Sequence, residues 1–102
     1  MKFEGIYTPI ITPHTEDGSI DKKAFAEVAE FLIDAGVHCI VVGGSTGEYY
    51  AQTYEERIEM MNLARELINK RVLLMVGTGA TRTEDCVMLA KAAKAAGADF
   101  LL

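Results

Sequence analysis

A chain of 102 residues holds one domain at most, and its composition of 50% apolar and 25% charged residues is ordinary for a soluble globular protein. The formal net charge is −5, and the Lys and Arg residues form no block. Nucleic acids and anionic membranes are therefore disfavoured as partners, because binding to either requires a basic surface.

The first strand and helix are predicted from residues 5–36. Residues 5–12, GIYTPIIT, are rich in Ile and Thr and predict a strand. Pro9 lacks a backbone donor, so the strand should be irregular there. Asp21 is a suitable N-cap for a helix that runs to Ala35, and Gly36 can end that helix in the left-handed conformation.

The second unit repeats this order. Residues 37–42, VHCIVV, are nearly all apolar, as expected of a strand that is covered on both faces. A glycine-rich turn follows, and Thr53 with Glu56 three residues later predicts a capping box at the start of the next helix. That helix should end at about Ile68.

The third unit contains a strand at 72–76 and a helix at 84–96, for which Thr83 is the predicted N-cap. Residues 98–102 predict the start of a fourth strand. The predicted strands recur roughly every 30 residues, the length of one βαβ unit.

Repeated units of this kind build either an open, doubly wound α/β sheet or a closed eight-stranded barrel, and the pattern alone does not choose between them. A closed barrel takes about 250 residues. Since the chain stops inside its fourth predicted strand, we expect residues 1–102 to be a single segment, the N-terminal portion of one domain of a longer polypeptide.

Ligands bind at the carboxyl ends of the strands in both architectures. The second turn, residues 43–48 with the sequence GGSTGE, follows the second strand. Ser45 and Thr46 supply two hydroxyls and two consecutive backbone N–H groups, which together suit a carboxylate or a phosphate. A plain strand-to-helix connection with a hydroxyl cap explains the same composition equally well.

The third turn, residues 77–81, matches only part of a dinucleotide-binding fingerprint. Gly77 and Gly79 are in place, but Arg82 stands where the third glycine should be, and no acidic residue ends the next strand. The sequence contains no Gly-Lys-Ser/Thr, so a phosphate-binding loop of that type is absent as well.

Five motifs in order resemble the dihydrodipicolinate synthase / N-acetylneuraminate lyase family of class I pyruvate-dependent aldolases. The resemblance spans all 102 residues, and the Gly-Ser-Thr-Gly-Glu turn is the most specific part of it. The motifs are Gly5-Ile6-x-x-Pro9-x-x-Thr12-Pro13, Asp17-Gly18-x-Ile20-Asp21, Gly43-Gly44-Ser45-Thr46-Gly47-Glu48, Glu55-x-x-x-Glu59 and Gly77-Thr78-Gly79-Ala80-x-x-Thr83.

The resemblance implies the N-terminal part of a (β/α)₈ TIM barrel, with about three βα units and the start of a fourth strand. It also implies a lyase, synthase or dehydratase in which a lysine forms a Schiff base with pyruvate or a related 2-oxo acid, without a cofactor. A cytoplasmic homotetramer is expected on the same grounds.

The resemblance also assigns roles to individual residues. Ser45 and Thr46 would bind the carboxylate of the 2-oxo acid, and the Thr46 hydroxyl would join a proton relay with a tyrosine further along the chain. Many synthases carry Asn where Thr81 stands, which leaves the substrate contacts there open. The remaining residues assigned to substrate binding are Gly44, Gly47, Gly79 and Thr81.

The Schiff-base lysine is not expected within this chain, because none of its lysines follows a predicted strand. Residues 1–102 alone should therefore be inactive and should supply only the carboxylate-binding turn. The alternative is a noncatalytic α/β fragment or a binding module for a small anion. The lysines are Lys2, Lys22, Lys23, Lys70, Lys91 and Lys94.

Cysteine usage and hydropathy agree with a cytosolic protein. Cys39 and Cys86 show no disulfide or metal-ligand spacing, so no metal is expected. No apolar run reaches the roughly 18 residues that a membrane span needs.

Several other residues near the turns are interpreted structurally. We expect His14 to be an exposed loop residue, His38 to be structural, and Glu48 to fix its turn. Tyr49 and Tyr50 follow Glu48 and are expected to pack, either at the pocket mouth or against another subunit.

Overall fold

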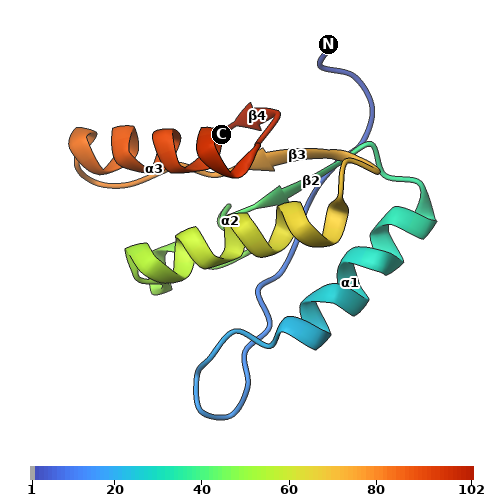
Figure 1. Cartoon of the computed structure of the whole chain (residues 1–102), viewed down its shortest axis with the longest axis horizontal. Coiled ribbons are helices and arrows are strands. Elements are labelled where there is room, and N and C mark those ends of the chain that lie inside the picture. Colours follow the sequence, from blue (N-terminus) through green and yellow to red (C-terminus); the bar gives the residue numbers. More distant parts are fainter. Residues whose placement is uncertain (1) are drawn as a thin grey trace.

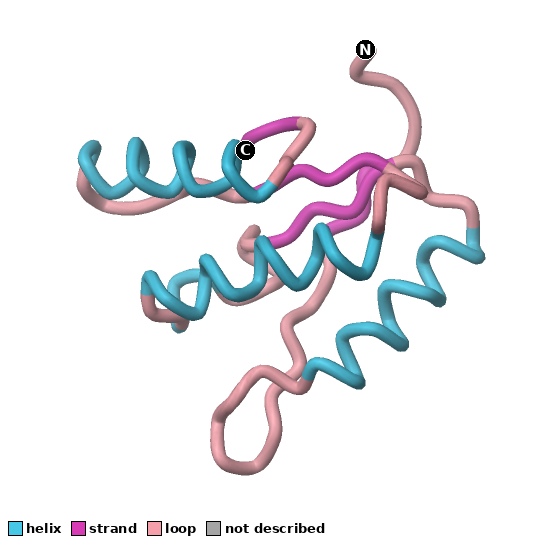
Figure 2. Tube along the Cα trace, viewed as in Figure 1, coloured by secondary structure: helices cyan, strands magenta, loops and turns pink. Residues whose placement is uncertain are grey.

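Strands and helices alternate along residues 2–102, which the computed structural model of the chain describes (Figures 1 and 2). The elements are β1 (Tyr7–Pro9), α1 (Lys22–Ala35), β2 (Cys39–Val42), the short 3₁₀ helix η1 (Tyr49–Ala51), α2 (Tyr54–Ile68), β3 (Leu73–Val76), α3 (Thr83–Ala96) and β4 (Phe100–Leu101).

The four strands form one parallel sheet in the order β1-β2-β3-β4. Cys39 in the second strand pairs with Tyr7 on one side and with Leu73 on the other. A sequential order with crossovers of one hand places every connecting helix on the same face of the sheet. This is the winding of a barrel, because a doubly wound sheet carries helices on both faces. The chain therefore has the α/β fold of part of a (β/α)₈ barrel.

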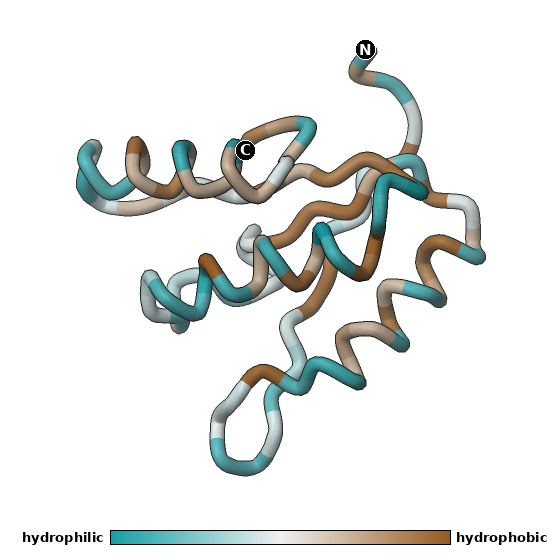
Figure 3. The backbone as a smooth tube through the Cα atoms, in the orientation of Figure 1, coloured by the Kyte–Doolittle hydropathy of each residue, from teal (hydrophilic) through white to brown (hydrophobic). Residues whose placement is uncertain are grey.

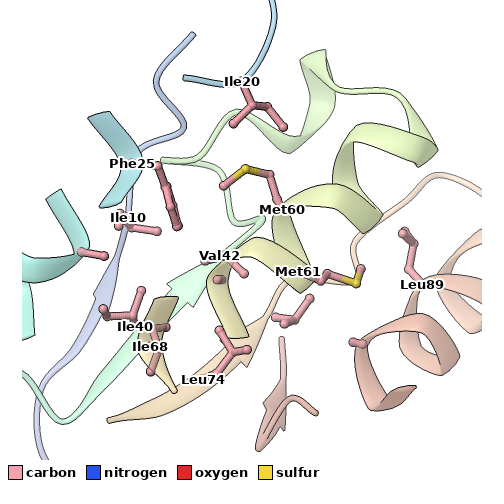
Figure 4. Packing of buried hydrophobic residues seen from close by; sticks show 14 residues of the cluster. Ile10, Ile20, Phe25, Ile40, Val42, Met60, Met61, Ile68, Leu74 and Leu89 are labelled. Atoms are coloured by element: carbon pink, nitrogen blue, oxygen red, sulfur yellow. The ribbon is translucent and has the colours of Figure 1, made fainter. Parts of the chain in front are cut away.

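The two faces of the sheet bury different residues. Ile40, Val42 and Leu74 point to the helices and pack with Met61 and other residues of one core (Figure 4). Val76 belongs to the same core. The central strands β2 and β3 are accordingly strongly hydrophobic along their length (Figure 3). The remaining members of this core are Ile10, Ile20, Phe25, Ala29, Met60, Ala64, Ile68, Leu89 and Ala93.

No helix covers the opposite face of the sheet in the described part of the chain. Cys39, Val41 and Met75 are buried there, with Tyr7 and Phe100 packed beside them. The alternation of the two sets along each strand follows from the two-residue period of a β-strand. In a closed barrel this second face is the interior.

The predicted helix ends are confirmed where the signal is local. The Asp21 side chain accepts a 3.0 Å hydrogen bond from the N–H of Ala24, and Gly36 ends the first helix with φ = 90°. The Thr53 hydroxyl accepts from the N–H of Glu56 at 3.1 Å, and the Glu56 carboxylate accepts from the N–H of Thr53 at 2.9 Å. This reciprocal pair is the predicted capping box.

The prediction for the third helix was wrong at its first turn. The helix begins at Thr83 itself, so this residue already has helical backbone angles and its hydroxyl does not cap the helix. Arg82 occupies the N-cap position with extended angles, and it lacks a short side-chain acceptor that could reach back to the helix.

The first strand is also shorter than predicted, because it covers only Tyr7–Pro9 of residues 5–12. Ile10 still donates a 3.0 Å hydrogen bond to the Val41 carbonyl. Beyond it the chain leaves the sheet, and the Thr12 hydroxyl bonds to the second turn instead.

The amino ends of the strands are fixed by polar side chains. His38 accepts a 2.9 Å hydrogen bond on Nδ1 from the N–H of Ile6, which confirms its structural role. The carboxylate of Asp99 accepts from the N–H of Leu74 at 2.9 Å, and Arg65 contacts that carboxylate at 3.5 Å. None of the described helices is long and apolar enough to cross a membrane.

Candidate functional site

The second and third turns meet through their backbones at the carboxyl ends of β2 and β3. The N–H of Gly77 donates a 2.8 Å hydrogen bond to the Val42 carbonyl. A Cβ on Gly77 would collide with the carbonyl oxygen of Gly43, which itself has φ = 71°. Only glycine allows these two backbones to approach so closely. The two turns therefore form one structural unit.

Residues that follow the first strand hold the second turn in place. The Thr12 hydroxyl, which is 6% exposed, donates a 2.8 Å hydrogen bond to the Gly47 carbonyl. The Gln52 side chain reaches the same carbonyl at 3.4 Å. A Cβ on Gly47 would lie only 3.1 Å from the Ile10 carbonyl oxygen, so the turn packs directly on the end of β1.

The second turn leaves two consecutive amides free. Its own hydrogen bonds run from the N–H of Gly47 to the Gly44 carbonyl at 3.1 Å and from the N–H of Glu48 to the Ser45 carbonyl at 3.0 Å. The N–H groups of Ser45 and Thr46 donate to no acceptor within residues 2–102, and both residues are exposed. An external anion can therefore accept from both amides.

Arg57 joins the second and third turns. The residue is buried, with 7% of its surface exposed. Its guanidinium donates hydrogen bonds to the Gly79 carbonyl at 2.7 Å and to the Gly77 carbonyl at 3.0 Å. The same group lies 4.8 Å from the centroid of the Tyr49 ring, which is a cation–π distance. Burial lowers the pKa of Arg57.

Sequence reasoning missed both Thr12 and Arg57. The spacing of Arg57 could have indicated that it is buried, because it lies on the same face of the second helix as Met61, Ala64 and Ile68. All four residues of that face are buried in the structure.

Gly79 and Thr81 lie in a different part of the site from Ser45 and Thr46. A Cβ on Gly79 would lie 3.6 Å from the Tyr49 ring, so this ring packs on the third turn. Gly79 and the exposed Thr81 line one surface cavity, to which neither Ser45 nor Thr46 contributes. The other residues that line it are Tyr49, Tyr50, Gln52, Arg57 and Ala80.

Glu48 fixes its turn through its backbone. It adopts the left-handed conformation with φ = 59°, and its side chain makes no capping hydrogen bond. Its carbonyl accepts from the N–H of Ala51 at 2.9 Å. Tyr50 is exposed and meets the Tyr49 ring edge-on, with 5.8 Å between the ring centroids. No group of three His, Cys, Asp or Glu residues able to hold a metal occurs among the described residues.

Comparison with known proteins identifies close relatives. The model of the dihydrodipicolinate synthetase family matches residues 2–102. A 4-hydroxy-tetrahydrodipicolinate synthase of Chelativorans sp. (strain BNC1) is 40% identical over 100 residues, which are 98% of this chain and 34% of that relative. The chain thus spans about a third of the length of this curated relative.

Solved structures show the same similarity. The 4-hydroxy-tetrahydrodipicolinate synthase from Methylacidiphilum fumariolicum SolV superposes with a TM-score of 0.95 at 38% identity, over 98% of this chain and 33% of that one. A prophage protein of the dihydrodipicolinic acid synthase family from E. coli K12, solved in complex with pyruvate, gives 0.94 at 36% identity, over 97% and 33%.

Proposed function

The chain belongs to the dihydrodipicolinate synthetase family, and from this membership we propose that it is part of a Schiff-base enzyme that acts on pyruvate or a related 2-oxo acid. The observation that carries the proposal is the pair of free amides at Ser45 and Thr46. A relative of known structure was solved with pyruvate, which is a 2-oxo acid of the proposed class.

The turn binds the substrate through its carboxylate. The N–H groups of Ser45 and Thr46 donate to the carboxylate oxygens, and hydrogen bonds to a charged acceptor are roughly twice as strong as neutral ones. Because Thr12 holds the turn at the Gly47 carbonyl, these donors need little reorganisation when the substrate binds. The bound carboxylate fixes the position of the neighbouring keto carbon.

A lysine outside these residues then attacks that carbon. Its neutral amine forms a C–N bond, two protons leave the nitrogen, and the keto oxygen departs as water, which yields the imine. The Thr46 hydroxyl carries protons between the nitrogen and oxygen atoms in this exchange, in relay with a tyrosine outside the chain. Fixing both reactants makes the addition effectively unimolecular.

Within residues 1–102 no lysine lies in the second or third turn, so the segment alone is proposed to be inactive. We propose on family resemblance that the substrate-binding residues are Ser45, Thr46, Gly44, Gly47, Gly79 and Thr81. On family resemblance we extend the proposal to a cytoplasmic homotetramer in which this segment is the N-terminal portion of one barrel domain.

Reductive trapping tests this function. The full-length protein and residues 1–102 are each incubated with pyruvate and borohydride, and their intact masses are compared. We expect a covalent adduct on the full-length protein at a lysine beyond Leu102 and no adduct on residues 1–102. An adduct on the short chain, or none on the full-length protein, would refute the proposal.

A binding module for a small anion is the second candidate, because the free amides of Ser45 and Thr46 would bind a carboxylate without any nucleophile. Calorimetry distinguishes the two. Pyruvate that binds the full-length protein but cannot be trapped by borohydride favours the module, whereas trapping favours the enzyme.

A further inference from the structure

One side chain, Arg57, contacts the third turn and the residue that directly follows the second turn, from the side of the helices. Its two terminal nitrogens hold the carbonyls of Gly77 and Gly79 at 3.0 and 2.7 Å. The guanidinium carbon lies 4.8 Å from the centroid of the Tyr49 ring, and Tyr49 directly follows the second turn. The first turn of α2 thereby connects two loops that are about 30 residues apart in sequence.

The orientation of these carbonyls determines where the following amides point. In a trans peptide the C=O and the N–H point in opposite directions. With the Gly77 carbonyl held at the helix side, the N–H of Thr78 points away from the helices, and it donates to the Leu102 carbonyl at 2.9 Å. The Gly79 carbonyl fixes the N–H of Ala80 in the same way.

A shift at Gly77 is transmitted to the second turn. Its backbone packs against Gly43 so closely that no side chain fits between them. Gly43 precedes the free amides of Ser45 and Thr46 by two and three residues in the same turn. Loss of the Arg57 contacts would therefore loosen the carboxylate-binding turn as well as the third turn.

Stability alone gives a poor account of an arginine at this position. Arg57 is buried, its Nε has no hydrogen-bond partner, and it forms no ion pair with any carboxylate among residues 2–102. Burying a charge without an opposite charge is costly, and an apolar side chain of similar size commonly stabilises such a site better. The two backbone carbonyls and the ring are what arginine can hold and an apolar residue cannot.

We propose that Arg57 is a positioning residue for 2-oxo acid binding, which locks the second and third turns together so that the Ser45 and Thr46 amides are set before the substrate arrives. The kinetic part of this inference rests on the proposed function. The structural part, the coupling of the two turns, does not.

Arg65 provides a matched control on the same helix. It too donates to a backbone carbonyl, that of Gly97, and contacts Asp99, but it does so at the opposite end of the sheet. Arg57→Lys and Arg65→Lys each retain the positive charge and remove the planar fork. The two variants therefore differ chiefly in which end of the sheet loses its support.

Amide hydrogen exchange and steady-state kinetics of the full-length protein test the coupling of the two turns and the positioning role of Arg57. We expect Arg57→Lys to speed amide exchange at Gly77 and Thr78 and to raise KM for pyruvate about tenfold, with a smaller change in kcat. Arg65→Lys should speed exchange at Leu74 instead and leave KM within about twofold. If Arg57→Lys does not fold, Tyr49→Leu keeps the Arg57 hydrogen bonds and removes the ring that contacts Arg57, Gly79 and Tyr50. This variant should speed exchange of the same amides and raise KM, both to a lesser degree.

The outcomes separate the two proposals. Unchanged exchange at Gly77 and Thr78 in the Arg57→Lys protein overturns the coupling, whatever the activity. Changed exchange with an unchanged KM overturns the positioning role. If the wild-type protein traps no pyruvate, the proposed enzymatic function fails, and the exchange measurement still decides whether Arg57 couples the turns.

Discussion

The hydroxyl of Thr12 donates a 2.8 Å hydrogen bond to the carbonyl of Gly47, and the two residues are 35 positions apart in the sequence. The bond is buried and joins the end of the first strand to the turn after the second. Among residues 2–102, only the longer contact from Gln52 shares this carbonyl. The stability of the turn and its shape should therefore depend on Thr12.

We predict that Thr12→Val destabilises the full-length protein by about 1–3 kcal/mol, because it leaves a buried carbonyl without its main donor. Thr8→Val is the matched control, since the Thr8 hydroxyl makes no hydrogen bond within the described residues, and its effect should stay within about 0.5 kcal/mol. Urea unfolding measures both values. Equal effects of the two substitutions would show that the bond contributes little.

Gly77 and Gly79 should differ sharply in their tolerance of alanine. A Cβ at Gly77 collides with the Gly43 backbone, which cannot move without displacing β2, so Gly77→Ala should cost about 2 kcal/mol or more. At Gly79 the new carbon would meet the Tyr49 ring at an ordinary 3.6 Å, and Gly79→Ala should change stability by less than about 1 kcal/mol. Thermal unfolding of the two proteins checks the ranking, and the reverse order would contradict this packing.

The stabilisation that the Asp17 carboxylate contributes to the folded state should be lost in acid. Hydrogen bonds from the Thr15 hydroxyl and from Ser19 lower the pKa of Asp17 from 3.8 to about 2. Because the folded-state pKa lies below the unfolded one, this stabilisation is present above pH 3.8 and is lost as the pH falls through about 2. Urea titrations across this window should show a shallower pH dependence for Asp17→Asn than for the wild type. Glu16→Gln, which removes the neighbouring carboxylate and leaves the hydrogen bonds of Asp17 in place, serves as the charge-matched control.

The two cysteines should react at different rates. Burial raises the pKa of Cys39 to about 11, and its side chain lies on the sheet face with Val41 and Met75. At pH 8 only on the order of 10⁻³ of this thiol is ionised, so iodoacetamide should modify the half-buried Cys86 first. Peptide mass spectrometry follows both sites. Equal rates in the native protein would contradict the burial of Cys39, whereas equal rates in urea are expected.

Ser45 and Thr46 should affect the proposed reaction differently. Ser45→Ala retains the backbone N–H and removes only a hydroxyl, so we expect a moderate rise in KM for pyruvate. Thr46→Val removes the proposed proton relay and should lower kcat about 10²- to 10⁴-fold. Steady-state kinetics of the full-length protein separates the two effects, and a Thr46→Val protein with wild-type kcat excludes the relay.

Local sequence signals predicted the helix ends well. Asp21 and the pair Thr53 and Glu56 accept hydrogen bonds from amides within three residues of them. Gly36 adopts the left-handed conformation, which glycine reaches more readily than other residues. The free amides of the second turn were also predictable, because they depend on the short sequence Gly-Gly-Ser-Thr-Gly. Thr83 was mispredicted because a Thr at the first helical position looks the same in sequence as one at the cap.

The supports behind the turns could not be predicted in the same way. Arg57 and Thr12 bind backbone carbonyls that are 20 to 35 residues away, and a carbonyl has no signature in the sequence. Arg57 on a helix normally indicates a solvated charge, and Thr12 at the end of a strand normally indicates β-propensity. Only the packing of the helix on the sheet gives these two residues their role.

The side chains of Ser45 and Thr46 make no hydrogen bond within the described chain, and the second turn is held at Gly47 by the side chain of Thr12. Substitution of these two side chains should therefore change the free energy of unfolding little. A combinatorial library randomised at these two positions should yield mostly soluble variants, from which selection could recover altered acid preferences.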